Sequence, residues 1–115
     1  MKAKSEEKLQ QECFVWHWNT YPDRRDFLYH NFNNPPNAIQ GAKLKTLGLI
    51  RGVADMTLLH GGKVYFIELK TFEGRQSQRQ KDWELSVTRE GFPYLVIRSL
   101  ESFKELIYKI YADRN

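Results

Sequence analysis

The sequence predicts a single small α/β domain over residues 1–115, with a mixed β-sheet flanked by helices and its elements in the order α-β-β-β-α-β-α. Three observations support this prediction. Two strand patterns flank the pair Gly61-Gly62, helical patterns occur near both ends of the chain, and a further helical pattern precedes a short apolar strand. A domain of this length buries roughly 65% of its unfolded surface, which is enough for a core without disulfides.

The first half of the chain is predicted to hold a helix, a strand and a second, short helix. Ser5 is a suitable N-cap for a helix that continues to about Asn19. Aromatic and polar residues alternate over 27–32, which indicates a strand. A short helix is expected over 38–47, where Gly48 would close it.

The second half contains the stronger patterns. Residues 54–59 and 63–71 are two strand signals, and the intervening glycines favour a tight hairpin. A helix is expected over 76–90 and a short strand over 93–98. From Ser99 onwards the apolar residues recur at helical spacing, which predicts a final amphipathic helix.

Charge and cysteine content narrow the class of protein. The formal net charge is +4 and the pI is near 9.2, which is compatible with a polyanionic partner. Cys13 is the single cysteine, so an internal disulfide and a zinc site built mainly of thiolates are excluded. No apolar run reaches the length of a signal peptide core or a membrane helix, so we expect a cytoplasmic protein with no membrane partner.

The predicted hairpin places three charged residues together. If Gly61 and Gly62 form the turn, Asp55 lies directly opposite Glu68 on the neighbouring strand. Strand alternation puts Lys70 on the same face as Glu68, one step further along. A turn of three or four residues would shift this register.

Such an arrangement is unfavourable unless a cation is present. Glu68 and Lys70 interrupt an apolar strand, and two facing carboxylates repel each other more strongly when buried. A divalent ion that binds both acids removes the repulsion, and hard oxygen ligands favour Mg²⁺ or Mn²⁺. The plainer interpretation is a salt bridge of Lys70 with Glu68 or Asp55 on a solvated edge. The apolar strand and the glycines at 48 and 52 favour the metal site.

Several segments together resemble the VRR-NUC domain, a branch of the PD-(D/E)XK nuclease superfamily. The resemblance extends from about Ser5 to Tyr111 and implies a small restriction-endonuclease-like core. The family usually has proline before its aspartate, whereas this chain has Ala54, a neighbour that binds no metal. The residues that carry the resemblance are Gly48, Gly52-Val53-Ala54-Asp55, Phe66-Ile67-Glu68-Leu69-Lys70-Thr71, Gly74-Arg75-Gln76-Ser77, Gln80 and Trp83.

The resemblance implies a role for each residue of the motif. Asp55 and Glu68 would be metal ligands, together with the backbone carbonyl of Leu69. Lys70 would position the attacking water, and Gln80 would be a supporting polar group at the start of the following helix. The expected cofactor is Mg²⁺ or Mn²⁺.

The family also places a glutamate on the first helix. At about 100° per residue, Glu6 and Glu12 lie on either side of the apolar stripe of this helix, whereas Glu7 points away from it. Helix geometry therefore leaves Glu6 and Glu12 open. The family order of Glu, Gln four residues later and then Trp resembles Glu6, Gln10 and Trp16, which implies Glu6 as the catalytic and metal-binding acid.

These features predict a metal-dependent DNA endonuclease that selects branched, junction or flap DNA and acts as a homodimer. The alternative is a non-catalytic DNA-binding module with the same fold. Six basic residues near the site are candidates for phosphate contacts, although a solvated basic face would explain them equally well. They are Lys43, Lys45, Arg51, Arg75, Arg79 and Lys81.

Overall fold

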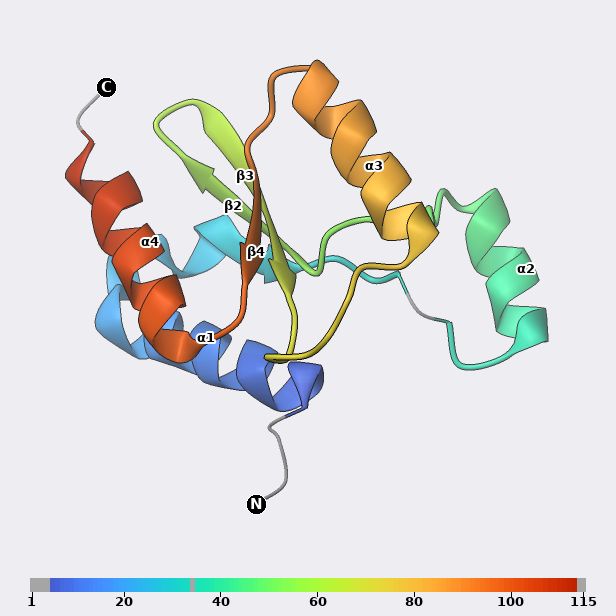
Figure 1. Cartoon of the computed structure of the whole chain (residues 1–115), viewed down its shortest axis with the longest axis horizontal. Coiled ribbons are helices and arrows are strands. Elements are labelled where there is room, and N and C mark those ends of the chain that lie inside the picture. The colour runs from blue at the N-terminus through green and yellow to red at the C-terminus, as the bar shows by residue number, and fades with distance from the viewer. Residues whose placement is uncertain (1–4, 34, 114–115) are drawn as a thin grey trace.

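The computed structural model describes residues 5–33 and 35–113 as one α/β domain (Figure 1). Its elements follow the predicted order, with the expected short helix near residues 38–47 and an additional, unpredicted 3₁₀-helix. They are α1 (Glu6–Thr20), the 3₁₀-helix η1 (Pro22–Phe27), β1 (Leu28–His30), α2 (Ala38–Thr46), β2 (Met56–His60), β3 (Lys63–Leu69), α3 (Gln78–Arg89), β4 (Tyr94–Ile97) and α4 (Leu100–Ala112).

The four strands form one mixed sheet in the order β1-β2-β3-β4. The pairs β1–β2 and β2–β3 are antiparallel, whereas β3 and β4 are parallel and are connected through α3. A parallel pair needs such a crossover because the chain must return to the end of the sheet at which the first strand began. The mixed sheet predicted from the sequence is therefore confirmed.

The hairpin has the predicted register. His60 faces Lys63 and Met56 faces Ile67, so the next positions along the two chains are Asp55 and Glu68. Gly61 and Gly62 have φ values of 60° and 77°, the left-handed conformation that a two-residue hairpin turn requires. Asp55 and Glu68 therefore lie next to each other at the open end of the hairpin.

Several elements differ in extent from the prediction by one or two residues at an end. β2 begins at Met56 rather than at residue 54, and β3 ends at Leu69 rather than at residue 71. β1 is shorter than 27–32, because the unpredicted 3₁₀-helix includes Phe27 and regular pairing ends at His30. α3 begins at Gln78 rather than at residue 76, because Ser77 is its N-cap. The Ser77 hydroxyl accepts from the Gln80 backbone N–H, which fixes where the helix starts.

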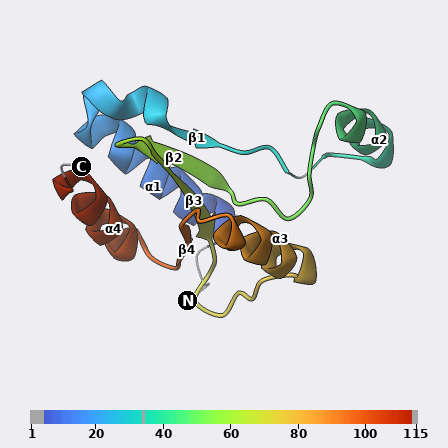
Figure 2. The same cartoon turned by 90° about the horizontal axis from the view of Figure 1, so that it is seen from above.

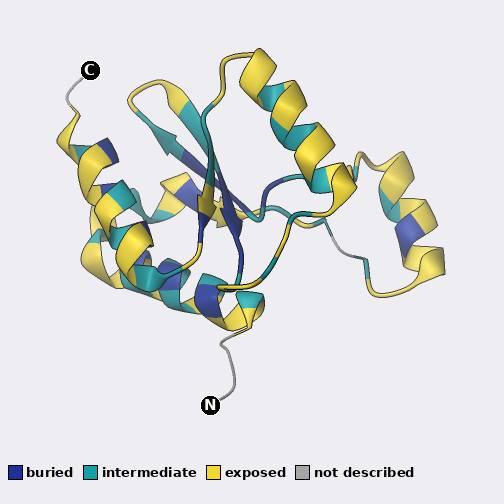
Figure 3. Ribbon diagram, viewed as in Figure 1, coloured by how far each residue is buried: buried dark blue, intermediate teal, exposed yellow. Residues whose placement is uncertain are grey.

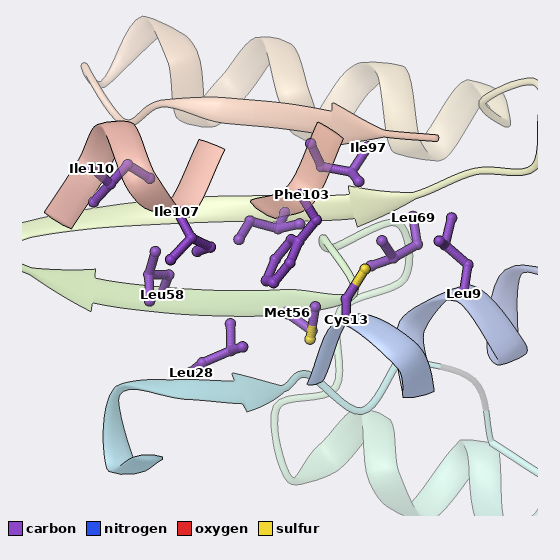
Figure 4. Close-up of a cluster of buried hydrophobic side chains, with 11 residues drawn as sticks. Leu9, Cys13, Leu28, Met56, Leu58, Leu69, Ile97, Phe103, Ile107 and Ile110 are labelled. Atoms are coloured by element: carbon purple, nitrogen blue, oxygen red, sulfur yellow. The ribbon is translucent and has the colours of Figure 1, made fainter. Parts of the chain in front are cut away.

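The core lies between one face of the sheet and the helices α1 and α4 (Figures 3 and 4). It combines alternate residues of the strands with one apolar stripe from each helix, as amphipathic elements require. The fully or largely buried members are Leu9, Cys13, Leu28, Met56, Leu58, Ile67, Leu69, Ile97, Phe103, Ile107 and Ile110.

The opposite face of the sheet is covered by α3. Phe66 alternates with the core residue Ile67 along β3, and its ring contacts Trp83 of α3 with 4.8 Å between centroids. Viewed from above, α3 and α4 lie apart from each other and α2 projects beyond the sheet (Figure 2). None of the helices in the described part of the chain is both long and apolar enough to span a membrane.

Candidate active site

Four charged side chains from three parts of the chain meet where the hairpin strands end. Asp55 directly precedes β2, Glu68 lies near the end of β3 and Lys70 follows that strand, while Glu6 is in the first turn of α1. The Nζ atom of Lys70 lies 3.8 Å from Glu6 Oε1 and 3.9 Å from Glu68 Oε2. The fold thus brings together the acids and the amine that the sequence singled out.

Asp55 is fixed by the neighbouring strand. Its Oδ2 accepts a hydrogen bond from the backbone N–H of Leu69 at 2.7 Å. Burial raises the pKa of the Asp55 carboxyl, and the negative charges of Glu68 and Glu6 raise it further. The Leu69 hydrogen bond and the Lys70 charge oppose this shift without cancelling it. The negative charge of ionised Asp55 is therefore not fully compensated in this site.

Glu68 has no exposed surface, and its two oxygens have different surroundings. Oε1 accepts hydrogen bonds from Gln76 Nε2 at 3.0 Å and from the Tyr94 hydroxyl. Burial, followed by the contact with Glu68, raises the pKa of Tyr94, so this hydroxyl stays protonated and donates. Oε2 is buried and has no hydrogen-bond partner among the described residues. An unsatisfied buried acceptor costs about 1–3 kcal/mol, which a bound cation would offset.

The donor atoms fit a hard divalent cation. Asp55 and Glu68 supply carboxylate oxygens, the ligands that Mg²⁺ and Mn²⁺ prefer. Within the described residues, no three His, Cys, Asp or Glu side chains are close enough to enclose an ion by themselves. Mg²⁺ is commonly held by one or two carboxylates and retains several waters, so this open arrangement suits it better than zinc.

Two glutamines near the start of α3 have different contacts. The side-chain oxygen of Gln80 accepts from the Ser77 backbone N–H and completes a capping box, so this contact serves the helix end. Gln76 instead reaches Glu68, and the same Nε2 donates to Glu84 Oε1 at 2.7 Å. The amide seen at the carboxylate site is thus Gln76, which sequence reasoning missed.

The predicted phosphate-binding residues divide into two groups. Arg51 and Arg79 line one cleft of about 420 Å³ together with Asp82, Trp83 and Ser86. The exposed residues Arg75 and Lys81 flank or begin α3, whereas Lys43 and Lys45 are exposed on the projecting helix α2. The structure therefore brings Arg51 and Arg79 together, and it places the two lysines of α2 on a separate element.

A second, larger groove opens beside the carboxylates. Its volume is about 970 Å³, and it lies between α1 and β1 with Glu6 and Asp55 among its lining residues. Aromatic side chains dominate its apolar part, and three of them remain at least two-fifths exposed. The groove gives a ligand access to the acidic residues from solvent. Its aromatic members are Phe14, Trp18, Tyr29 and Phe32.

Fold and site together define a restriction-endonuclease-like α/β domain with an acidic pair and a lysine at one end of the sheet. No protein-family profile and no curated protein matches the sequence. Among solved structures, the chain is similar to a VRR_NUC domain protein with a TM-score of 0.80 and 18% identity, over 97% of this chain and 92% of the other. The chain therefore has the VRR-NUC fold, as the resemblance in the sequence implied.

Proposed function

We propose that this protein is a Mg²⁺- or Mn²⁺-dependent nuclease that hydrolyses phosphodiester bonds in DNA. The observation that carries the proposal is the state of Glu68, a fully buried carboxylate whose Oε2 lies 3.9 Å from Lys70 and accepts no hydrogen bond from any described residue. A structural salt bridge alone would leave this acceptor unsatisfied.

Each charged residue has a role in this reaction. Asp55 and Glu68, with the Leu69 carbonyl and Glu6 as further candidates, would hold the cation. When bound, a divalent cation supplies Lewis-acid activation of water and of the scissile phosphate. Lys70 would orient the attacking water and offset negative charge on the phosphate oxygens.

Hydrolysis of a phosphodiester needs only water as a second reactant. The water oxygen bonds to phosphorus, one ester P–O bond breaks, and the products are a phosphate monoester and a strand end with a free hydroxyl. One proton of the water passes to the leaving oxygen and the other is released to solvent. Lys70, whose Nζ lies 3.9 Å from Glu68 Oε2, would stabilise charge without being consumed.

We also propose that the substrate is branched DNA and that the enzyme is a homodimer. Arg51, Arg79 and the basic residues of α2 would contact phosphates away from the cut.

On α2 and the turn that follows, Ile39 and Leu47 are 84% and 72% exposed. A short helix is marginal in water without packing, so a second copy that covers α2 would stabilise it. Sedimentation of a monomer at all micromolar concentrations would contradict the dimer.

The test is a panel of labelled substrates, namely duplex, flap, splayed-arm and four-way-junction DNA, incubated with Mg²⁺ or Mn²⁺. We expect cleavage that EDTA abolishes and that Asp55→Ala reduces by at least about a hundredfold. Asp23→Ala, at an exposed acid of η1 away from the site, is the matched control and should cleave normally. Salt-sensitive binding of these DNAs without any cleavage would instead identify a non-catalytic DNA-binding module.

A further inference from the structure

The Glu68 carboxylate is held from one side by groups of two other elements. The Tyr94 hydroxyl, at the first residue of β4, donates to Oε1. Gln76, in the loop before α3, donates to the same oxygen at 3.0 Å. The Gln76 nitrogen is itself anchored by Glu84 of α3 at 2.7 Å. Glu68 is therefore fixed by residues that follow it in the chain and lie on the α3 face of the sheet.

This contact pattern makes the two oxygens of Glu68 inequivalent. A carboxylate oxygen has two favoured acceptor directions, and two donors at Oε1 occupy both. Oε2 lies on the Lys70 side, where the ammonium is 3.9 Å away, and no donor among the described residues is close enough to form a hydrogen bond with it. Rotation of the carboxylate to present both oxygens to one ion would break both hydrogen bonds inside a buried site.

We propose that Tyr94 and Gln76 are positioning residues that restrict Glu68 to one free oxygen and thereby make the site select small octahedral cations over Ca²⁺. The inference rests on the nuclease proposal, because it concerns the same metal site. Mg²⁺ requires near-ideal octahedral geometry with short bonds, whereas Ca²⁺ takes six to eight oxygens and often uses a carboxylate through both. A one-oxygen Glu68 therefore favours Mg²⁺ and Mn²⁺.

The experiment measures cation binding in the absence of DNA, by titration calorimetry of the full chain with MnCl₂ and with CaCl₂. Tyr94→Phe removes one donor with little change of shape, and Gln76→Leu removes the other. Each variant should bind Mn²⁺ about tenfold more weakly, as is usual when a partner of a metal ligand is lost. Binding of Ca²⁺ should be unchanged or tighter, so that the preference for Mn²⁺ falls about tenfold.

Matched controls separate positioning from general damage. Tyr108→Phe removes a hydroxyl from an exposed tyrosine of α4, and Gln78→Leu removes an exposed amide that pairs with Asp82. Both should keep the wild-type ratio of affinities. Thermal melting without metal checks that Tyr94→Phe is folded, and Gln76→Leu gives an independent measurement if it is not.

A ratio of Mn²⁺ to Ca²⁺ affinity that stays within twofold of wild type in both Tyr94→Phe and Gln76→Leu overturns the proposal, even if both affinities fall together. Failure of the nuclease proposal looks different, because it shows either as a wild-type chain that binds neither cation or as a wild-type chain that binds them and cleaves none of the DNA substrates. A loss of folding would also lower both affinities together and leave the ratio unchanged, so the ratio is read only on a variant that thermal melting shows to be folded.

Discussion

The carboxylate of Asp55 accepts the backbone N–H of Leu69 at 2.7 Å, at the point where β2 has not yet begun and β3 ends. The Asp55 side chain thus accepts the hydrogen bond that a backbone carbonyl would accept if the regular strand pairing continued to this position. The contact satisfies a buried donor and fixes the direction of the carboxylate. Strand pairing and the geometry of the acidic site are therefore set by the same bond.

Asp55→Asn should abolish cleavage and stabilise the metal-free protein. Because the pKa of Asp55 is raised by burial, its contribution to stability is present below about pH 3.8 and is lost as pH rises through the folded pKa. Asparagine keeps an oxygen for Leu69 but carries no charge, so we expect a gain of about 0.5–2 kcal/mol at pH 7. Urea denaturation in EDTA measures it. Equal or lower stability of the variant would contradict this account of the site.

Lys70→Met should leave a folded but weakened protein that cannot cleave DNA. The side chain is 7% exposed and is paired with Glu6 and Glu68, so its loss leaves a buried carboxylate without a cation. We expect destabilisation of roughly 3 kcal/mol in EDTA, at the lower end for buried pairs, and partial recovery with saturating Mn²⁺. Lys109→Met, at an exposed position of α4, is the control. Cleavage by Lys70→Met at a normal rate would remove Lys70 from the mechanism.

Gly52→Ala should be more destabilising than Gly48→Ala. Both glycines have positive φ, 87° and 105°, so both substitutions strain the backbone. A Cβ at residue 52 would also lie 2.6 Å from the Arg79 carbonyl oxygen, whereas a Cβ at residue 48 meets nothing within 4 Å. The difference in unfolding free energy should be about 1–3 kcal/mol. Equal effects in chemical denaturation would show that the turn does not pack tightly on α3.

Stability should fall in mild acid because of His17. This side chain is buried, its Nε2 lies 2.6 Å from the Tyr111 hydroxyl, and burial followed by the Arg24 charge lowers its pKa. A lowered folded pKa means that stability is full above the unfolded value of 6.5 and is lost as pH falls toward the folded pKa. The slope is at most about 1.4 kcal/mol per pH unit for one proton. His17→Gln should flatten the plot of unfolding free energy against pH, measured by urea denaturation between about pH 7 and about pH 5. An unchanged slope would exclude His17 as the cause of the loss of stability.

Much of the fold could be predicted from local sequence pattern. The helical and strand periods gave the element order, and Gly61-Gly62 gave a register that places Asp55 beside Glu68. The short helix η1 (Pro22–Phe27) was missed because six residues are too few to show an apolar period. The predicted limits of β1 were wrong because the alternation of aromatic and polar residues continues into residues that do not pair with β2.

The support of the site was harder to predict, because it depends on contacts across the crossover through α3. Tyr94 follows Glu68 by 26 residues, and no spacing rule connects them before the parallel register of β3 and β4 is known. Gln76 and Gln80 are of the same residue type, and the sequence does not tell which one caps the helix and which one reaches Glu68. The roles of Gln80, Glu6 and Leu69 in the reaction remain predictions.

The parallel pairing of β3 with β4 also sets the order in which the site is assembled during synthesis. A nascent chain that has left the ribosome as far as Gly91 already contains Asp55, Glu68 and Lys70, but it lacks the strand that carries Tyr94 and Ile97. Glu68 at that stage has a solvated edge beside it and no hydroxyl to hold its Oε1. The hydrolysis proposed above would therefore become possible only once the last strand is in place, and an unfinished copy would be a poor threat to the DNA around it.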